Sequence, residues 1–482
     1  MRGLIANRFV LLGLVMLALA ALFGVAWITR PAARTAVRAA GRPAMTPVVS
    51  AIRSCPAPGS GRVAVFAASA GPAGKGGAQL LAAPAAPAVA GAPLVTLTQP
   101  GRLWLSRGVF AAARTRHGGR GGAVTVHASG AMAQGLDAEQ TIYPPNGSAG
   151  SVTGAQCTQP GADFWFVGPG SARSASLSLF LVNPDSGQAE ADAEIFTDMG
   201  PLQGNADTGI VVPPGGSVVQ SIAKFAKGSH VLALHVRTSV GRVSAAVRAG
   251  GVWWRGATAP ATQLVIPGLP GTGTGRRLYL ADPGGNDAQV HVRAITPAGS
   301  YEPAGASGID VPAGSVVALD LPSLNGIPAA LRLSSAVPVT AAMLVNGRAF
   351  TAATPPIEQQ GVIADNVVGS GFKASLVLSA PAGAAQVRIA TADTHGQLGA
   401  SRLVSIRARH SASVPVTVPA AARGVAQGFA IVISPVGHSG PVYAGRVLTA
   451  QGSGIQMITP VLSAPASVVL PAISGLAGAA IP

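Results

Sequence analysis

Apolar and polar residues alternate over short stretches through most of this chain, which is the pattern of half-buried β-strands. In the stretch "AQVHVRAIT", which begins at Ala288, Val290 and Val292 would face a core while His291 would face solvent. Turns rich in Gly and Pro separate such stretches about every ten residues. The pattern therefore predicts an all-β fold built from many short strands.

The strands recur as units of similar layout. A turn written "VPPGGS" and then "VPAGS" precedes a valine-rich strand, and Ser217, Ser315 and Ser413 follow one another at intervals of 98 residues. Pro presets the backbone for the turn and Gly relieves it, although the third copy lacks both residues. With about seven strands in each unit, we expect tandem immunoglobulin-like β-sandwich repeats, and a β-propeller is the alternative.

This repeat sets the expected domain boundaries. The three regular copies are expected at residues 160–256, 260–349 and 360–449. A degenerate β domain is expected before them at 61–145, and an apolar tail rich in Pro and Ala follows them at 450–482.

The N-terminal region breaks the strand pattern. Residues 9–28 form an apolar run of 20 residues without a charge, and a helix of that length crosses the bilayer core of about 30 Å. We expect a retained transmembrane anchor, with a cytoplasmic N-terminus at 1–8 and a linker at 29–60. A cleaved signal peptide is the alternative. The long body would then be extracytoplasmic, in a single-pass protein of the cell membrane.

The cysteines agree with export. Cys55 and Cys157 are the only two in the chain, and an exported protein meets an oxidising environment. We expect one intramolecular disulfide between them that ties the degenerate domain to the regular copies. Two buried free thiols are the alternative.

The chain is basic, with a net charge of +16. The densest basic cluster is in a glycine-rich stretch, and adjacent tryptophans lie further along the chain. These residues are candidates for binding an anionic or carbohydrate polymer of the cell envelope, and they are Arg107, Arg114, Arg116, Arg120, Trp253 and Trp254. Solvated loops and buried rings are the alternative. Because the basic residues are scattered and the body is exported, we expect no nucleic-acid partner.

Catalytic motifs are lacking. The stretch "GTGTG" at 271–275 lies between two expected strands and has no helix N-terminus behind it, so it does not fit a phosphate-binding loop. The histidines are dispersed and no pair of carboxylates is placed for hydrolysis. We therefore expect no enzyme activity, no catalytic residue, no metal and no cofactor. The favoured role is structural, or one of interaction with an envelope protein or polymer.

The layout also resembles a known family. The features are the N-terminal apolar segment, Cys55, the stretch "ASGAMAQGLDAEQ", the stretch "DFWFVG" after Cys157, and repeats containing "VPAGS". Together they resemble the actinobacterial secreted proteins grouped as domain of unknown function 5719. The sequence departs from the expected pattern at "DFWFVG", where two adjacent tryptophans would be expected. The resemblance implies an envelope-associated protein and assigns no functional residue.

Overall fold

The computed structural model describes most of the chain, with gaps. The described residues are 2–28, 44–57, 61–67, 76–83, 93–99, 109–114, 122–143, 152–172, 176–202, 208–273, 275–322, 324–366, 371–393, 398–419, 428–452 and 454–470. They form two units, one comprising residues 1–46 with 467–482 and the other residues 47–466.

The smaller unit contains the helix α1 (Arg2–Ile28) and a two-stranded sheet of β1 (Ala44–Pro47) and β35 (Ser467–Leu470). Within the part of the chain that is described, no helix has the length and apolarity needed to cross a membrane.

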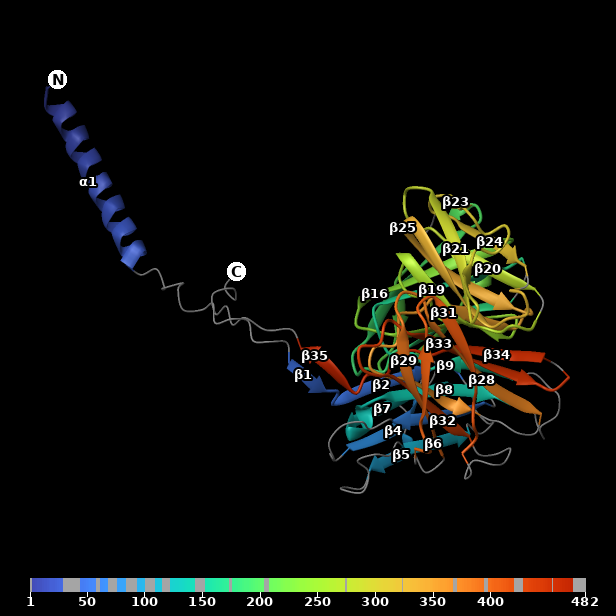
Figure 1. The fold of residues 1–482 in the computed structure, drawn as a ribbon. Coiled ribbons are helices and arrows are strands. Elements are labelled where there is room, and N and C mark those ends of the chain that lie inside the picture. Colours follow the sequence, from blue (N-terminus) through green and yellow to red (C-terminus); the bar gives the residue numbers. More distant parts are fainter. Residues whose placement is uncertain are drawn as a thin grey trace. The chain divides into compact units, whose positions relative to one another are not determined.

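The larger unit is all-β (Figure 1). Its described strands form seven sheets, which we group into four sheet pairs by counting the single 8-stranded sheet, in which one long strand serves two halves, as the third pair. The first sheet pair is formed by β2 (Ser50–Cys55), β3 (Arg62–Ala67), β4 (Gly76–Ala83), β5 (Pro93–Gln99), β6 (Val109–Arg114), β7 (Ala123–Gly130), β8 (Leu136–Ile142) and β9 (Thr153–Gln156). A short 3-10 helix, Ala131–Ala133, joins β7 to β8. The strand order is β2-β7-β4-β5 in one sheet and β6-β3-β8-β9 in the other.

The second sheet pair repeats this order. Its strands are β10 (Asp163–Pro169), β11 (Leu177–Val182), β12 (Ala189–Thr197), β13 (Gly200–Pro201), β14 (Ile210–Val212), β15 (Ser217–Ser221), β16 (Val231–Val240), β17 (Ser244–Ala249) and β18 (Val252–Trp253). One sheet runs β10-β16-β12, with both β13 and β14 paired to β12, and the other runs β15-β11-β17-β18. A 3-10 helix, Ile222–Lys224, follows β15.

The third sheet pair has the same arrangement, but one long strand belongs to both halves. Its strands are β19 (Ala261–Leu269), β20 (Arg276–Ala281), β21 (Ala288–Thr296), β22 (Gly299–Tyr301), β23 (Ile309–Val311), β24 (Val316–Leu321), β25 (Ala329–Val345) and β26 (Ala349–Ala352). The first part of β25 pairs with β19 and β21, and its last part pairs with β20 and β26.

The fourth sheet pair returns to the order of the first. Its strands are β27 (Gly361–Asn366), β28 (Phe372–Ala380), β29 (Ala385–Ala392), β30 (Arg402–Ile406), β31 (His410–Pro415), β32 (Phe429–Pro435), β33 (Tyr443–Ala450) and β34 (Gly454–Pro460). The sheets run β27-β32-β29-β30 and β31-β28-β33-β34.

The alternating pattern places the cores between the sheets. In β21, Val290 and Val292 are buried while His291 and Arg293 are exposed, as the sequence predicts. The two sheets of each pair contribute to one hydrophobic core. In the described residues the sheets pair in this way and no ring of propeller blades closes, so the β-propeller alternative is wrong.

The repeated turn is more variable than the serine spacing suggests. Gly215 and Gly314 have positive φ values of 58° and 68° just before β15 and β24, and Arg409 has a φ of 61° just before β31. Ser413 lies inside β31, paired with Val377, and is therefore not the equivalent of Ser217. A one-for-one repeat of the serine breaks down because the last turn lacks the Pro and Gly residues.

Strands also lie outside the expected domain boundaries. β2 falls within the expected linker 29–60, β9 falls between the expected domains, and β34 falls within the expected tail. These strands are short and lie next to turn residues, so alternation alone gave little signal for them.

Candidate functional site

The expected disulfide between Cys55 and Cys157 is confirmed. Cys55 ends β2 and Cys157 directly follows β9, and both sulfur atoms lie in the core of the first sheet pair. The bond therefore joins the first and last strands of one sheet pair. The expectation that it ties two domains together is wrong, because β2 belongs to the first sheet pair and not to a linker.

Only one of the four arginines in the predicted basic cluster lies among the described residues. Arg114 ends β6, where its backbone pairs with that of Arg62. The other three members, Arg107, Arg116 and Arg120, lie outside the described residues.

The two predicted tryptophans are buried, with exposed fractions of 4% for Trp253 and 3% for Trp254. The Trp253 ring lies 5.0 Å from the ring of Phe180, and the Trp254 ring stacks on that of Phe350 at 5.6 Å. The prediction that these two rings are exposed and can stack on a polymer is therefore wrong. Trp253 packs with Ala155, Ala246 and Phe180, and Trp254 belongs to a hydrophobic cluster that also contains Phe350.

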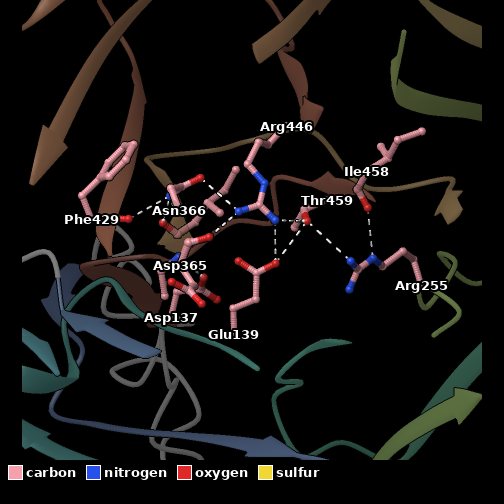
Figure 2. Close-up of polar contacts among 11 residues, drawn as sticks. Asp137, Glu139, Arg255, Asp365, Asn366, Phe429, Arg446, Ile458 and Thr459 are labelled. Carbon is pink, nitrogen blue, oxygen red and sulfur yellow. Dashed lines mark hydrogen bonds and ion pairs between the residues drawn. The ribbon is translucent and has the colours of Figure 1, made fainter. Parts of the chain in front are cut away.

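A charged junction is instead buried where the first sheet pair meets the fourth (Figure 2). Glu139 on β8 and Arg446 on β33 form an ion pair, with Oε1 and Nη2 2.8 Å apart, and their side chains are 1% and 0% exposed. The hydroxyl of Thr459 on β34 accepts a hydrogen bond from Arg446 Nη2 at 2.6 Å and donates one to Glu139 Oε1 at 3.1 Å. A buried ion pair needs such additional bonds to offset the loss of hydration.

Arg446 also binds the end of β27. Its Nη1 donates to Oδ1 of Asn366 at 3.0 Å and to the backbone carbonyl of Asp365. Asn366 in turn donates through Nδ2 to the carbonyl of Phe429 at 3.0 Å. One guanidinium group thus connects three strands of the fourth sheet pair to β8 of the first.

Arg255 brings the second sheet pair to the same junction, because it follows β18. Its Nε donates to the carbonyl of Ile458 at 3.2 Å, and its Nη2 lies 3.5 Å from the hydroxyl of Thr459. Burial lowers the pKa of Arg255 to about 10, while Glu139 acts in the opposite direction and Arg446 in the same one.

A second carboxylate on β8, Asp137, faces the fourth sheet pair. Its Oδ2 accepts a hydrogen bond from the backbone N–H of Ala364 at 3.2 Å. Burial raises the pKa of Asp137 to about 7, opposed by the charge of Arg53 and assisted by that of Glu139. Burial also raises the pKa of Glu139, against the attraction of Arg446 and Arg255.

The contacts of this junction hold strands of different sheet pairs together. The polar contacts run from one strand to another, and Phe66 of β3 packs beside it against Val362, Ala430 and Val432 of the fourth sheet pair. Figure 1 shows strands of the first pair, blue to cyan, beside orange and red strands of the fourth. The junction therefore joins sheet pairs that are far apart in the sequence.

Sequence reasoning missed this junction, although β8 carries a signal for it. The stretch "LDAEQTI" places polar residues on both faces of a strand, and all but the last of its residues are buried. A strand that is polar on both faces and buried on both faces has to find partners outside its own core.

The model of a family of unknown function, DUF5719, matches residues 112–417, which is more than half of the chain. The chain belongs to the DUF5719 family. No curated protein shows significant similarity to it.

The DUF5719 match contains the second and third sheet pairs complete and only parts of the first and fourth. It includes Glu139 and Cys157, whereas Arg446 and Cys55 lie beyond its ends. Both the disulfide and the buried ion pair therefore connect the matched region of DUF5719 to residues outside it.

Proposed function

We propose that this DUF5719 protein is a membrane-anchored, extracytoplasmic protein of the cell envelope with a structural or interaction role. The apolar run 9–28 supports the anchor, and the Cys55–Cys157 disulfide carries the proposal of an oxidising compartment. In the structural role, the body is a rigid platform whose first and fourth sheet pairs are held together by the Glu139–Arg446 junction.

The four sheet pairs are tandem copies of one sandwich domain in this proposal. Their common strand order supports a repeat origin. They are immunoglobulin-like in size and in having two layers, but not in strand order. In the first copy the first strand, β2, pairs with the sixth, β7, whereas in immunoglobulin domains the first strand pairs with the second.

Fractionation of cells that produce the full chain tests the anchor and the compartment. We expect the chain to remain in carbonate-washed membranes, and its body to be digested when protease is added after the cell wall is removed. A chain whose N-terminus begins beyond residue 28 would contradict the anchor. A body that resists protease until the membrane is opened would contradict export.

A second role is binding of an anionic or carbohydrate envelope polymer, which the positive net charge of +16 favours. Its test is retention of the detergent-solubilised full chain on isolated cell-wall material at low and at high salt. We expect retention that falls as salt rises, because salt screens the attraction between charges. Absence of any retention at low salt would contradict this role.

A further inference from the structure

Two cavities meet at a pair of hairpin turns that belong to different sheet pairs. The β17–β18 hairpin contributes Gly250 and Val252, and the β25–β26 hairpin contributes Gly347 and Phe350, to the walls of both cavities. Their volumes are about 480 and 400 Å³, within the range of small-molecule sites. Because four residues line both cavities, the two cavities are direct neighbours.

The smaller cavity is basic. Its wall contains the three arginines Arg248, Arg255 and Arg348, and none of its described lining residues is Asp or Glu. Arg348 is exposed, and its Nη1 lies 3.4 Å from Oε1 of Gln456. A site with several guanidinium groups and no carboxylate in its wall favours a carboxylate or phosphate group.

Three hydrogen-bond donors on residues that line this cavity also lack an acceptor. Arg248 Nε and Arg255 Nη1 are buried and have no hydrogen-bond partner, and the same holds for Nε1 of Trp253. The guanidinium of Arg248 lies over the Trp253 ring at 5.4 Å, which holds it against the wall. Buried donors without acceptors are costly, and a bound anion is what would satisfy donors in this wall after small side-chain rotations.

The larger cavity combines aromatic rings with an ion pair. Trp254, Phe350 and Tyr279 contribute to its wall although each is no more than 3% exposed, and Arg277 and Asp320 contribute a charged pair with Nη1 and Oδ2 3.0 Å apart. A sugar ring offers apolar C–H groups to aromatic side chains and hydroxyl groups to a carboxylate and a guanidinium. The larger cavity therefore suits a sugar ring better than a purely apolar ligand.

We propose that the two cavities form one binding site for an acidic saccharide. The sugar ring occupies the cavity of Trp254 and Asp320, and its carboxylate or phosphate group occupies the cavity of Arg248 and Arg348. This inference deepens the polymer-binding role proposed above and rests on it. It does not require the membrane anchor.

Calorimetric titration of the full chain in detergent micelles tests the site. The probes are a uronic-acid disaccharide, a hexose phosphate, the neutral disaccharide and inorganic phosphate. We expect at least one acidic sugar to bind about tenfold or more tightly than the neutral disaccharide, as is typical of added charge-assisted hydrogen bonds. The two acidic probes distinguish a carboxylate-bearing from a phosphate-bearing ligand.

Variants assign the two halves of the site. Arg348→Gln should weaken acidic sugars about tenfold and leave the neutral disaccharide unchanged, and Asp320→Asn should weaken both kinds of sugar. Arg388→Gln, at an exposed position of β29, is the matched control and should change neither.

Three outcomes would overturn the proposal: no probe binds, inorganic phosphate binds as tightly as the hexose phosphate, or Arg348→Gln and Arg388→Gln behave alike. Retention on cell-wall material without binding of these probes would overturn this site and leave the polymer-binding role. Binding of the probes without retention on the wall would contradict that role and leave the site.

Discussion

The first and third sheet pairs have the same strand order, yet different interactions stabilise them. The third has a core of Leu, Val and Ala side chains, and β25 runs through both of its halves without a break. In the first, the core residues that the structure describes are mostly Ala and Val, a disulfide lies within that core, and charged residues are buried on β8.

The difference follows from what each strand faces. β21 of the third pair faces its core on one side and solvent on the other, so it alternates cleanly. β8 faces its own core on one side and the fourth sheet pair on the other, where Asp137 and Glu139 find partners. The same strand order therefore accepts either kind of sequence. On β8, the hydrogen bonds to Asp137 and to Oε1 of Glu139 offset part of the cost of burial, while Oε2 of Glu139 and the amide group of Gln140 have no hydrogen-bond partner among the described residues.

The largest expected effect comes from removing the disulfide. The cysteines are 102 residues apart, and closing a loop of that length stabilises by about 4.7 kcal/mol in the chain-entropy model. In the variant Cys55→Ala/Cys157→Ala, we expect amide hydrogens in residues 50–156 to exchange faster, while those in 261–352 change little. Hydrogen exchange followed by mass spectrometry measures both regions in one sample. Equal acceleration in both regions would show that the bond stabilises the whole unit and would remove the contrast.

Breaking the buried ion pair should cost nearly as much. Arg446→Met leaves Glu139 buried without its partner, and such changes destabilise by about 3–5 kcal/mol. Urea unfolding measures the loss of free energy. The matched control is Arg332→Met in β25, where the guanidinium donates hydrogen bonds to the exposed side chain of Gln263 and a change of less than about 1 kcal/mol is expected.

Adding Glu139→Gln to Arg446→Met sharpens this test, since it removes the charge left behind. We expect the double variant to be more stable than Arg446→Met alone. If it is less stable, the cost of Arg446→Met does not arise from an unpaired charge.

A smaller effect is expected in the dependence of stability on pH. The pKa of Asp137 is about 7 in the folded protein against 3.8 for an unperturbed group, so between these values the folded state holds a proton that the unfolded state has lost. The free energy of unfolding should therefore fall as pH rises from about 4 to 7, and the raised pKa of Glu139 acts in the same direction.

Asp137→Asn should flatten this fall by an amount on the order of 3 kcal/mol, since one pKa unit corresponds to about 1.4 kcal/mol and the pKa of about 7 lies roughly three units above 3.8. Urea midpoints measured at pH 4 and pH 7 provide the check. An unchanged slope in the variant would mean that Asp137 is not the group responsible.

Several features could be predicted from local pattern. The alternation in "AQVHVRAIT" correctly predicted both the strand β21 and its buried face. The two cysteines left one possible pairing, which is the one formed. The sequence left open whether Trp253 and Trp254 are exposed binding residues or buried rings, and the structure shows that they are buried. Local pattern could not decide this, because it does not indicate whether a neighbouring domain covers an aromatic residue next to a turn.

The sequence by itself determined the all-β class, because alternation along the chain shows which stretches are strands, and it favoured the disulfide, because the chain has only two cysteines. Only the tertiary structure decided which strands pair, where the disulfide lies within a sheet pair, and which charges meet. Glu139 and Arg446 are 307 residues apart, and nothing near either residue indicates the other. Their partnership follows from the packing of the first sheet pair on the fourth, where excluding water leaves each buried charge dependent on the other.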